Sequence, residues 1–329
     1  MVKVRFWSLV FFLMAFAWEP RQIAAGPKHV DTDHIGQRNI NAGQINLYSI
    51  DKEIAIGKQL SLEVEQSSRI LDDPEVTEYI NRLGQNIVRN SDSQVPFLIK
   101  VIDSDEVNAF ALPGGFFYVN TGLILAAQEE SELAGVMAHE IAHVAARHAT
   151  EQFSKGRLFN LASIPLVFVG GPIGFGIQQA MSLLVPLQFL QFSRGSEREA
   201  DFLGLQYMYK TGYDPLSFVS FFEKVSAQEK KKPGLLSRAF STHPMTKDRI
   251  SLAQKEIQEL LPVHEQYVLS TSEFDHVKAH LREHNNSPND VSDGSDSRPK
   301  LKRKAQTSEE TSEGEQPPAD NVPRLTRNP

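Results

Sequence analysis

The sequence predicts an α+β fold that is mainly α-helical, with one buried helix packed on a small antiparallel sheet. Three observations lead to this fold class. Apolar residues recur with helical spacing in several long segments. Three short runs rich in β-branched and aromatic residues lie close together between residues 97 and 120. Residues 129–153 are apolar or small around most of a helical circumference, and a helix of that kind is buried.

The first helices follow a polar, irregular lead-in over residues 26–48. A helix is expected over residues 49–68, where isoleucine, leucine and valine recur along the segment. Asp73 and Pro74 form a favourable N-cap and first-position pair for a second helix. Two helices are therefore expected before the sheet.

Three strands are expected next. Residues 97–103 have β character, while residues 107–111 and 116–120 flank the turn formed by residues 112–115. The turn contains Gly114 and Gly115, so the two later runs are expected to pair as a hairpin. The pattern predicts an antiparallel sheet of about three strands.

An apolar segment over residues 158–192 follows the buried helix, and proline and glycine interrupt it every few residues. The interruptions argue against a membrane-spanning helix. The composition favours a pair of short helices that cover the core over the alternative, a surface that contacts a membrane.

The last predicted helices span residues 196–210 and 246–261, with a third beginning after Asp214 and Pro215. From residue 284 the chain is polar and charged with almost no apolar residue, which predicts a disordered tail over residues 284–329. The folded domain is therefore expected over residues 49–283.

The N-terminus predicts export. Lys3 and Arg5 precede an uncharged apolar run over residues 6–18, which is shorter than the roughly 20 residues that span a bilayer. Small residues follow, and we expect residues 1–25 to be a signal peptide cleaved after Ala25. The alternative is an uncleaved anchor. The expected location is the periplasm, with peripheral membrane contact as a further alternative.

Composition removes several classes of function. The net charge of −7 argues against a nucleic-acid-binding protein, which carries a basic face. The chain of 329 residues contains no cysteine, so disulfides, thiolate ligands, cysteine nucleophiles and a lipoprotein anchor are excluded. Any transition metal must be held by histidines and carboxylates.

The buried helix carries His139, Glu140 and His143 in the pattern HExxH. Residues four apart lie about 40° apart around a helix, so both imidazoles can bind one Zn²⁺. Glu140 lies one position along, where it can act as a general base without being a ligand. The alternative is a pair of core histidines that are hydrogen-bonded to the backbone.

A catalytic zinc site requires a third protein ligand. Glu197 and Asp201 are four residues apart on the following helix, so one can bind the metal while the other accepts the spare N–H of a ligand histidine. Glu199 points about 200° away from Glu197 and is less suited to that task. His148 lies too far along the helix from His139 to share the metal.

These motifs resemble the HtpX and CAAX-prenyl-endopeptidase family of gluzincins, and most closely its exported, BepA-like bacterial branch. The resemblance implies a zincin-like peptidase domain with one zinc ion per subunit, Glu197 as the third ligand and Asp201 as its support. HtpX-like members carry membrane-spanning helices and BepA-like members continue into helical repeats, and neither feature is expected here. The matching stretches are residues 108–115, 121–123, 132–143, 193–194, 197–201, 242–244 and 249–250.

The expected reaction is the hydrolysis of peptide bonds by a zinc metalloendopeptidase with Glu140 as base. Arg194 and His243 are candidate donors to the oxyanion. Alternatively, His243 fills the fourth zinc position and blocks water, or is a loop histidine without a role. Four residues form a candidate edge strand that pairs with extended substrate by β-addition: Asn108, Ala109, Phe110 and Ala111.

The expected substrates are unfolded or misassembled cell-envelope proteins, and the outer-membrane assembly machinery is a candidate partner. A different class of function is a periplasmic chaperone or assembly factor with a rarely used zinc site. Glu140 weighs against this class because a structural site needs no base. A zinc hydrolase of cell-wall peptides is a third alternative.

Overall fold

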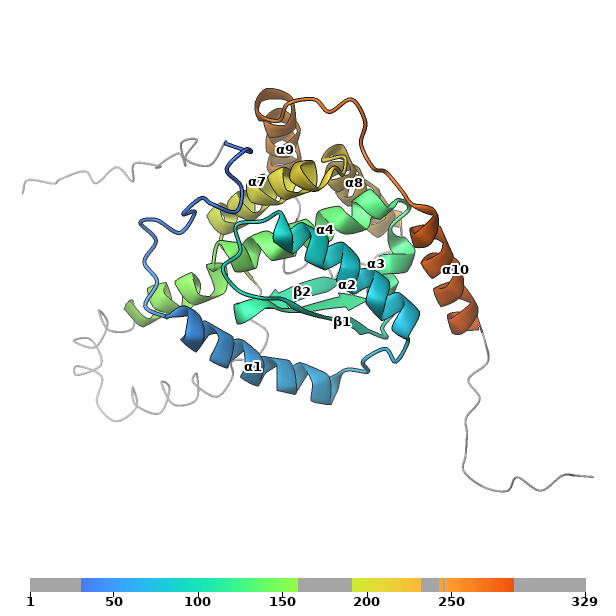
Figure 1. The fold of residues 1–329 in the computed structure, drawn as a ribbon, viewed down its shortest axis with the longest axis horizontal. Helices are drawn as coiled ribbons and strands as arrows, with labels where there is room; N and C mark the ends of the chain where they lie inside the picture. The colour runs from blue at the N-terminus through green and yellow to red at the C-terminus, as the bar shows by residue number, and fades with distance from the viewer. Residues whose placement is uncertain (1–30, 159–190, 232–242, 245, 287–329) are drawn as a thin grey trace, which may run out of the picture. The chain divides into compact units, whose positions relative to one another are not determined.

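The computed structural model describes residues 31–158, 191–231, 243–244 and 246–286, and this part of the chain is mainly helical around one small sheet (Figure 1). The predicted α+β class is confirmed. The expected signal peptide, nearly all of the apolar segment 158–192 and the tail beyond residue 286 lie outside the described residues. The helices are α1 Ile50–Ser67, α2 Pro74–Arg89, α3 Thr121–Ala126, α4 Glu130–Ala145, α7 Arg194–Thr211, α8 Leu216–Lys231, α9 Lys247–Leu260 and α10 Ser272–Asn286.

The sheet contains β1 Leu98–Ile102, β2 Ala109–Leu112 and β3 Phe116–Asn120 in the order β1-β3-β2. β2 and β3 form the predicted antiparallel hairpin. β1 pairs with β3 in parallel, so the sheet is mixed and the expectation of a wholly antiparallel sheet is wrong at this pair. Residue type indicates that a segment is a strand, but its partner depends on the path of the connection. Here residues 103–108 lead the chain to the far side of β3.

The hairpin turn depends on glycine. Gly114 and Gly115 have φ angles of 76° and 91°, a region that residues with a Cβ rarely occupy. A Cβ on Gly115 would also lie 2.1 Å from the carbonyl oxygen of Pro96. The turn therefore holds β2 in a fixed register against β3, with β2 at one edge of the sheet within the described chain.

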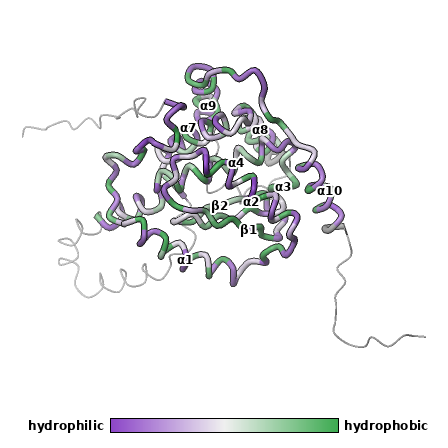
Figure 2. The backbone as a smooth tube through the Cα atoms, in the orientation of Figure 1, coloured by the Kyte–Doolittle hydropathy of each residue, from purple (hydrophilic) through white to green (hydrophobic). Residues whose placement is uncertain are grey.

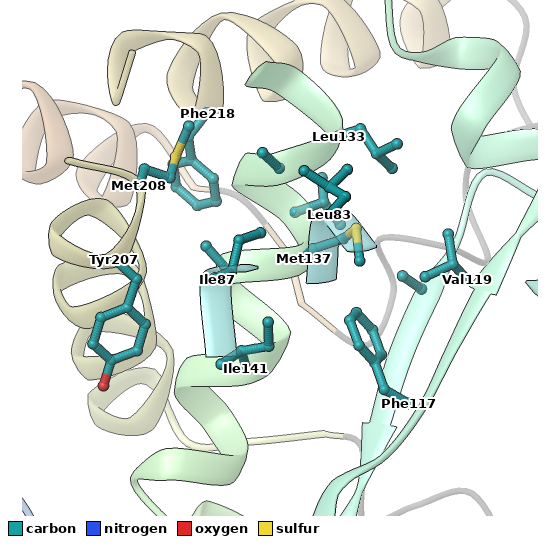
Figure 3. Packing of buried hydrophobic residues seen from close by; sticks show 14 of the residues in the cluster. Leu83, Ile87, Phe117, Val119, Leu133, Met137, Ile141, Tyr207, Met208 and Phe218 are labelled. Carbon is teal, nitrogen blue, oxygen red and sulfur yellow. The ribbon is translucent and has the colours of Figure 1, made fainter. Parts of the chain in front are cut away.

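Helices cover both faces of the sheet. On one face, Leu60 and Val64 of α1 pack against buried Tyr118. On the other face, α2 packs on β1 and α4 packs on β2, and α7 and α8 pack on α4 (Figure 3). The strands are mostly hydrophobic, whereas α10 is mostly hydrophilic (Figure 2). The labelled core residues around α4 are Leu83, Ile87, Phe117, Val119, Leu133, Met137, Ile141, Tyr207, Met208 and Phe218.

Every residue of α4 is buried, which confirms the predicted buried helix. The helix ends earlier than predicted, because Ala146 and Arg147 form a turn before residues 148–158 become helical again. Arg147 has a left-handed φ of 55°, a conformation that costs about 1–2 kcal/mol. Its side chain donates hydrogen bonds to Glu53 Oε2 at 2.8 Å and to the carbonyl of Tyr48 at 2.7 Å, which offset that cost.

The predicted helix starts follow from side-chain caps. Asp73 accepts a hydrogen bond from the backbone N–H of Val76 at the start of α2. Ser193 caps α7 in the same way, and Gly212 ends that helix with a φ of 85°. Thr246 caps α9. The predicted helices in these regions are confirmed to within about two residues.

Two helices were absent from the sequence prediction. α3 is short and follows β3 directly, and its interior Leu123 and Ile124 are buried. α10 buries Phe274, Val277 and Leu281, which have helical spacing, and it runs past the expected domain boundary at residue 283. None of the helices in the described ranges is both long and apolar enough to cross a membrane.

Candidate metal centre

Four buried side chains meet where α4, α7 and the segment before α9 come together. His139 and His143 of α4, Glu197 of α7 and His243 each offer one ligand atom, and these atoms lie within 4.8 Å of one another. All four residues are at most 5% exposed. The structure thus brings together the three predicted metal ligands and adds His243 to the group.

Close packing of α4 on α7 brings Glu197 to the histidines. A Cβ at Gly204 of α7 would lie 3.2 Å from the Cα of His139, so glycine at this position permits the approach. The cap at Ser193 starts α7 less than two turns before Glu197, and the carboxylate therefore comes from a fixed first turn. Both helices are rigid elements, which holds the ligands in place without the metal.

The distances fit a single ion. His139 Nε2 and His143 Nε2 are 3.1 Å apart. The carboxylate of Glu197 reaches both, with Oε2 3.6 Å from His139 Nε2 and Oε1 3.6 Å from His143 Nε2. Two nitrogens that each bind zinc at 2.0–2.1 Å in a tetrahedral arrangement lie about 3.3 Å apart. These nitrogen and oxygen donors are ones that zinc accepts.

His243 adds a second sign of a ligand site. Its Nδ1 lies 2.8 Å from Glu197 Oε1, which fixes the ring orientation. Its Nε2 is buried and has no hydrogen-bond partner among the described residues, although Glu140 Oε1 is 3.6 Å away. A buried nitrogen without a partner is costly, and a metal ion or a substrate atom at this position removes the cost.

Asp201 and Arg249 support the ligands from behind. Asp201 Oδ1 lies 3.0 Å from His139 Nδ1, close enough to orient that ring. Arg249 donates hydrogen bonds to both carboxylate oxygens of Asp201, at 2.7 and 2.6 Å. Its Nη1 lies 2.9 Å from Glu197 Oε2 and 3.0 Å from the carbonyl of Pro244, next to His243. One guanidinium therefore holds the third ligand, its neighbour and the loop that carries His243.

Sequence reasoning gave Arg249 no role beyond its place in a matching stretch. A signal was present, since Arg249 and Ala253 are the buried residues of α9 and Ile257 is partly buried on the same stripe. A charged residue on the buried stripe of an amphipathic helix must find an opposite charge. That rule predicts a buried ion pair without naming the partner.

Glu140 lies between the metal ligands and the edge strand. Its Oε2 accepts a hydrogen bond from the backbone N–H of Ala111 at 3.3 Å. In the β2–β3 pair, Asn108 bonds to Asn120 and Phe110 lies opposite Tyr118. Because backbone groups alternate along an antiparallel strand, those of Ala109 and Ala111 point away from β3. The unpaired side of β2 therefore lies beside Glu140.

A small cavity adjoins this side of the site. His139, Glu140 and His243 are among the residues that line it. Asn108 and Ala109 of the candidate edge strand also line it. The remaining lining residues are apolar: Val107, Leu123, Val136 and Phe222.

A comparison with protein-family models identifies the family to which this chain belongs. The family model described as Peptidase family M48 matches residues 72–257, which include α4, α7 and the group of ligands. The chain belongs to peptidase family M48. Its metal-binding residues are those of an M48 metalloendopeptidase, since the two histidines and the glutamate are all present. The family resemblance inferred from the motifs is confirmed.

Curated M48 relatives have related sequences. The β-barrel assembly-enhancing protease of Yersinia pestis is 32% identical over 227 residues, covering 65% of this chain and 46% of the relative. That of Escherichia coli strain K12 is 31% identical over 246 residues, covering 70% and 48%. The mitochondrial metalloendopeptidase OMA1 of Schizosaccharomyces pombe is 34% identical over 227 residues, covering 68% and 65%. The chain thus spans about half the length of the first two relatives.

The electrostatics of this M48 site separate the roles of its residues. Burial disfavours the charged form of His139, but contacts with Asp201 and Glu197 outweigh it and raise its pKa to about 9. Burial lowers the pKa of His143 well below its usual range, and the neighbouring His139 acts in the same direction. Burial also favours protonation of Glu197, yet contacts with His139 and His243 hold its pKa below the usual value. Glu197 is therefore ionised and available as a ligand.

Glu140 behaves differently from Glu197. Burial raises its pKa, and only part of this effect is reversed by the nearby His243 and His139. A carboxylate with a raised pKa accepts a proton more readily near neutral pH, as a general base must. Two glutamates in one buried site thus have pKa values shifted in opposite directions.

Arg194 is the predicted site residue that the structure leaves apart from the others. It is exposed in the first turn of α7, and none of its contacts in the described part of the chain reaches the metal ligands. The cation that does lie beside the ligands is Arg249. The side chain of Phe110 is also directed elsewhere, since it stacks on Tyr118 on the face of the sheet that α1 covers. The other predicted residues lie around one centre.

Proposed function

We propose that this chain is a zinc-dependent metalloendopeptidase that acts in the periplasm on unfolded or misassembled proteins of the cell envelope. The observation that carries the proposal is the position of Glu140 between the buried metal ligands and the unpaired edge of β2. One zinc ion per chain would be held by His139, His143 and Glu197. The outer-membrane assembly machinery is the proposed partner.

A bound zinc ion supplies Lewis-acid activation of water and of the scissile carbonyl. Glu140 takes the proton from the attacking water and returns it to the leaving amine, and its raised pKa suits both transfers. His243 Nε2 lies 3.6 Å from Glu140 Oε1, so the His243 ring and the base face the same part of the site. Asp201 and Arg249 keep His139 and Glu197 oriented during the reaction.

The edge of β2 supports an unfolded substrate. The N–H and C=O of Ala109 and the C=O of Ala111 point away from β3, where an extended peptide adds as a further strand, while the N–H of Ala111 is bonded to Glu140. Such pairing needs a segment with free backbone groups, which unfolded chains offer and folded domains do not. The apolar cavity beside Glu140 then receives a side chain next to the scissile bond.

Two points support the proposed action on envelope proteins in the periplasm. The expected signal peptide points to export, and two of the relatives are named β-barrel assembly-enhancing proteases. We therefore expect unfolded β-barrel proteins of the outer membrane to be substrates. For the apolar segment 158–192, covering the core remains the expectation and contact with a membrane the alternative.

The test uses one outer-membrane β-barrel protein in two states. The full chain is incubated with the barrel diluted from urea, and in parallel with the same barrel folded in detergent. We expect fragments from the unfolded barrel alone. Suppressed aggregation without fragments identifies the chaperone alternative instead. Equal cleavage of both states contradicts the requirement for an unfolded substrate.

A further inference from the structure

His148 has a buried position that the proposed reaction leaves unused. The residue is 1% exposed and directly follows the turn of Ala146 and Arg147 that ends α4. Its Nδ1 lies 2.9 Å from Nδ1 of His143, on the side of that ring away from the other ligands. Its Nε2 lies 3.3 Å from Oε2 of Glu199. Two histidines and a carboxylate thus form a row that begins at a metal ligand.

The protons along this row follow from the chemistry of imidazole. A histidine that binds a metal through Nε2 carries its remaining proton on Nδ1. His143 therefore donates from Nδ1, and His148 must accept with a bare Nδ1. A neutral His148 then carries its proton on Nε2, which faces the carboxylate of Glu199. The three groups specify one consistent set of tautomers.

We propose that His148 is a positioning residue for the metal ligand His143, and that Glu199 fixes the tautomer of His148. The proposal rests on the proposed metal site. His148 is too far along the chain to join the ligands, so it acts only through His143. Glu199 points away from Glu197 on α7, so the sequence made it a poor candidate for direct support of a metal ligand. Its contact is with His148 instead.

The surroundings of His143 favour this role. Phe192 stacks on the ring at 4.2 Å between centroids and 22° between planes, which fixes its face. The contact with His148 fixes the rotation within the plane and keeps Nε2 directed toward His139 and Glu197, which would hold the metal with it. His139 has the corresponding support from the carboxylate of Asp201. Each ligand histidine therefore has its own outer partner, as metal-binding histidines require.

The experiment measures zinc affinity of the purified full chain by competition with a chromophoric chelator. His148→Leu removes the acceptor, and the affinity should fall about 10- to 100-fold, the usual loss when an outer partner is removed. His148→Asn retains an oxygen acceptor near the position of Nδ1 and should stay within about threefold of the wild type. The contrast between the two variants separates hydrogen-bond acceptance from packing.

Glu199→Leu provides a second test, because the side chain of Glu199 is 34% exposed and we expect the fold to tolerate its loss. Its affinity should fall about threefold to tenfold, less than for His148→Leu. Thr150→Val is the matched control. It removes a buried hydroxyl from the same helical stretch, whose partners are Glu53 and Asn46, and should leave zinc affinity unchanged.

Zinc affinity within twofold of the wild type in Glu199→Leu, or in a folded His148→Leu, overturns the assignment. Equal losses in His148→Leu and His148→Asn also overturn it, since packing alone would then explain the effect. A wild-type chain that binds no zinc refutes the proposed function itself. The two failures are therefore distinguishable.

Discussion

Removing the guanidinium of Arg249 tests how the site is held together. The pairs of Arg249 with Asp201 and Glu197 are almost fully buried, with side chains 4–5% exposed. Arg249→Met leaves the buried Asp201 without its main counter-charge and removes a cation that lies beside the buried Glu197. Breaking a buried pair in this way costs about 3–5 kcal/mol. His139 still contacts Asp201, so we expect the lower end, about 3 kcal/mol.

The assay is urea and thermal unfolding of the metal-free protein. A loss of about 3 kcal/mol lowers the midpoint by about 6–12 °C for a domain of this size. Arg82→Met is the control, since its side chain is 49% exposed and its pairs with Glu78 and Glu273 contribute less than about 1 kcal/mol. Adding Asp201→Asn to Arg249→Met should restore part of the stability, because one orphaned charge disappears. A loss below about 1 kcal/mol for Arg249→Met refutes this reasoning.

Three further predictions follow from the same geometry. In the metal-free protein, the pKa of about 9 for His139 lies above its unfolded value, so its stabilising contribution is complete below pH 6.5 and is lost as the pH rises through 9. Zinc must displace this proton from His139. Calorimetry in buffers of different ionisation enthalpy should therefore show about one proton released per zinc ion bound at pH 7.5. Binding without proton release contradicts the raised pKa of His139. Ala109→Pro removes an N–H that points away from β3 and leaves the hydrogen bonds between β2 and β3 intact. It should raise KM for an unfolded substrate about threefold to tenfold at nearly constant kcat. An unchanged KM argues against pairing of the substrate with β2. His243→Ala opens the fourth ligand position and should raise basal proteolysis, whereas a fall in activity makes His243 a transition-state donor.

The parts of the fold and of the site that could be predicted are those that depend on local sequence patterns. The apolar circumference of α4 indicates burial, and a buried HExxH helix requires a partner for its polar groups. The four-residue spacing of Glu197 and Asp201 on α7 then offers a ligand and its support. Caps at Asp73, Ser193 and Thr246 fix helix starts because they act over three residues.

The parts that could not be predicted depend on contacts between distant segments. β1 pairs with β3 because of the path of residues 103–108, and the composition of the strands does not determine that path. The left-handed turn at Arg147 is held by Glu53, which lies far away in the sequence. Arg249 was missed as a support for the same reason, because its partner Asp201 lies on α7. His148 is only five residues from His143, but its contact with that ring crosses the turn at Arg147, and its contact with Glu199 depends on the packing of α7.

The central claim is that Glu140 is the base of a zinc-dependent peptidase. The most direct measurement compares zinc content and the degradation of an unfolded, casein-like protein for the wild type and Glu140→Gln. Because Glu140 is not a ligand, both proteins should contain about one zinc ion per chain. Only the wild type should degrade the substrate, with the variant reduced by at least about 100-fold. Equal degradation by the two zinc-loaded proteins would contradict the account.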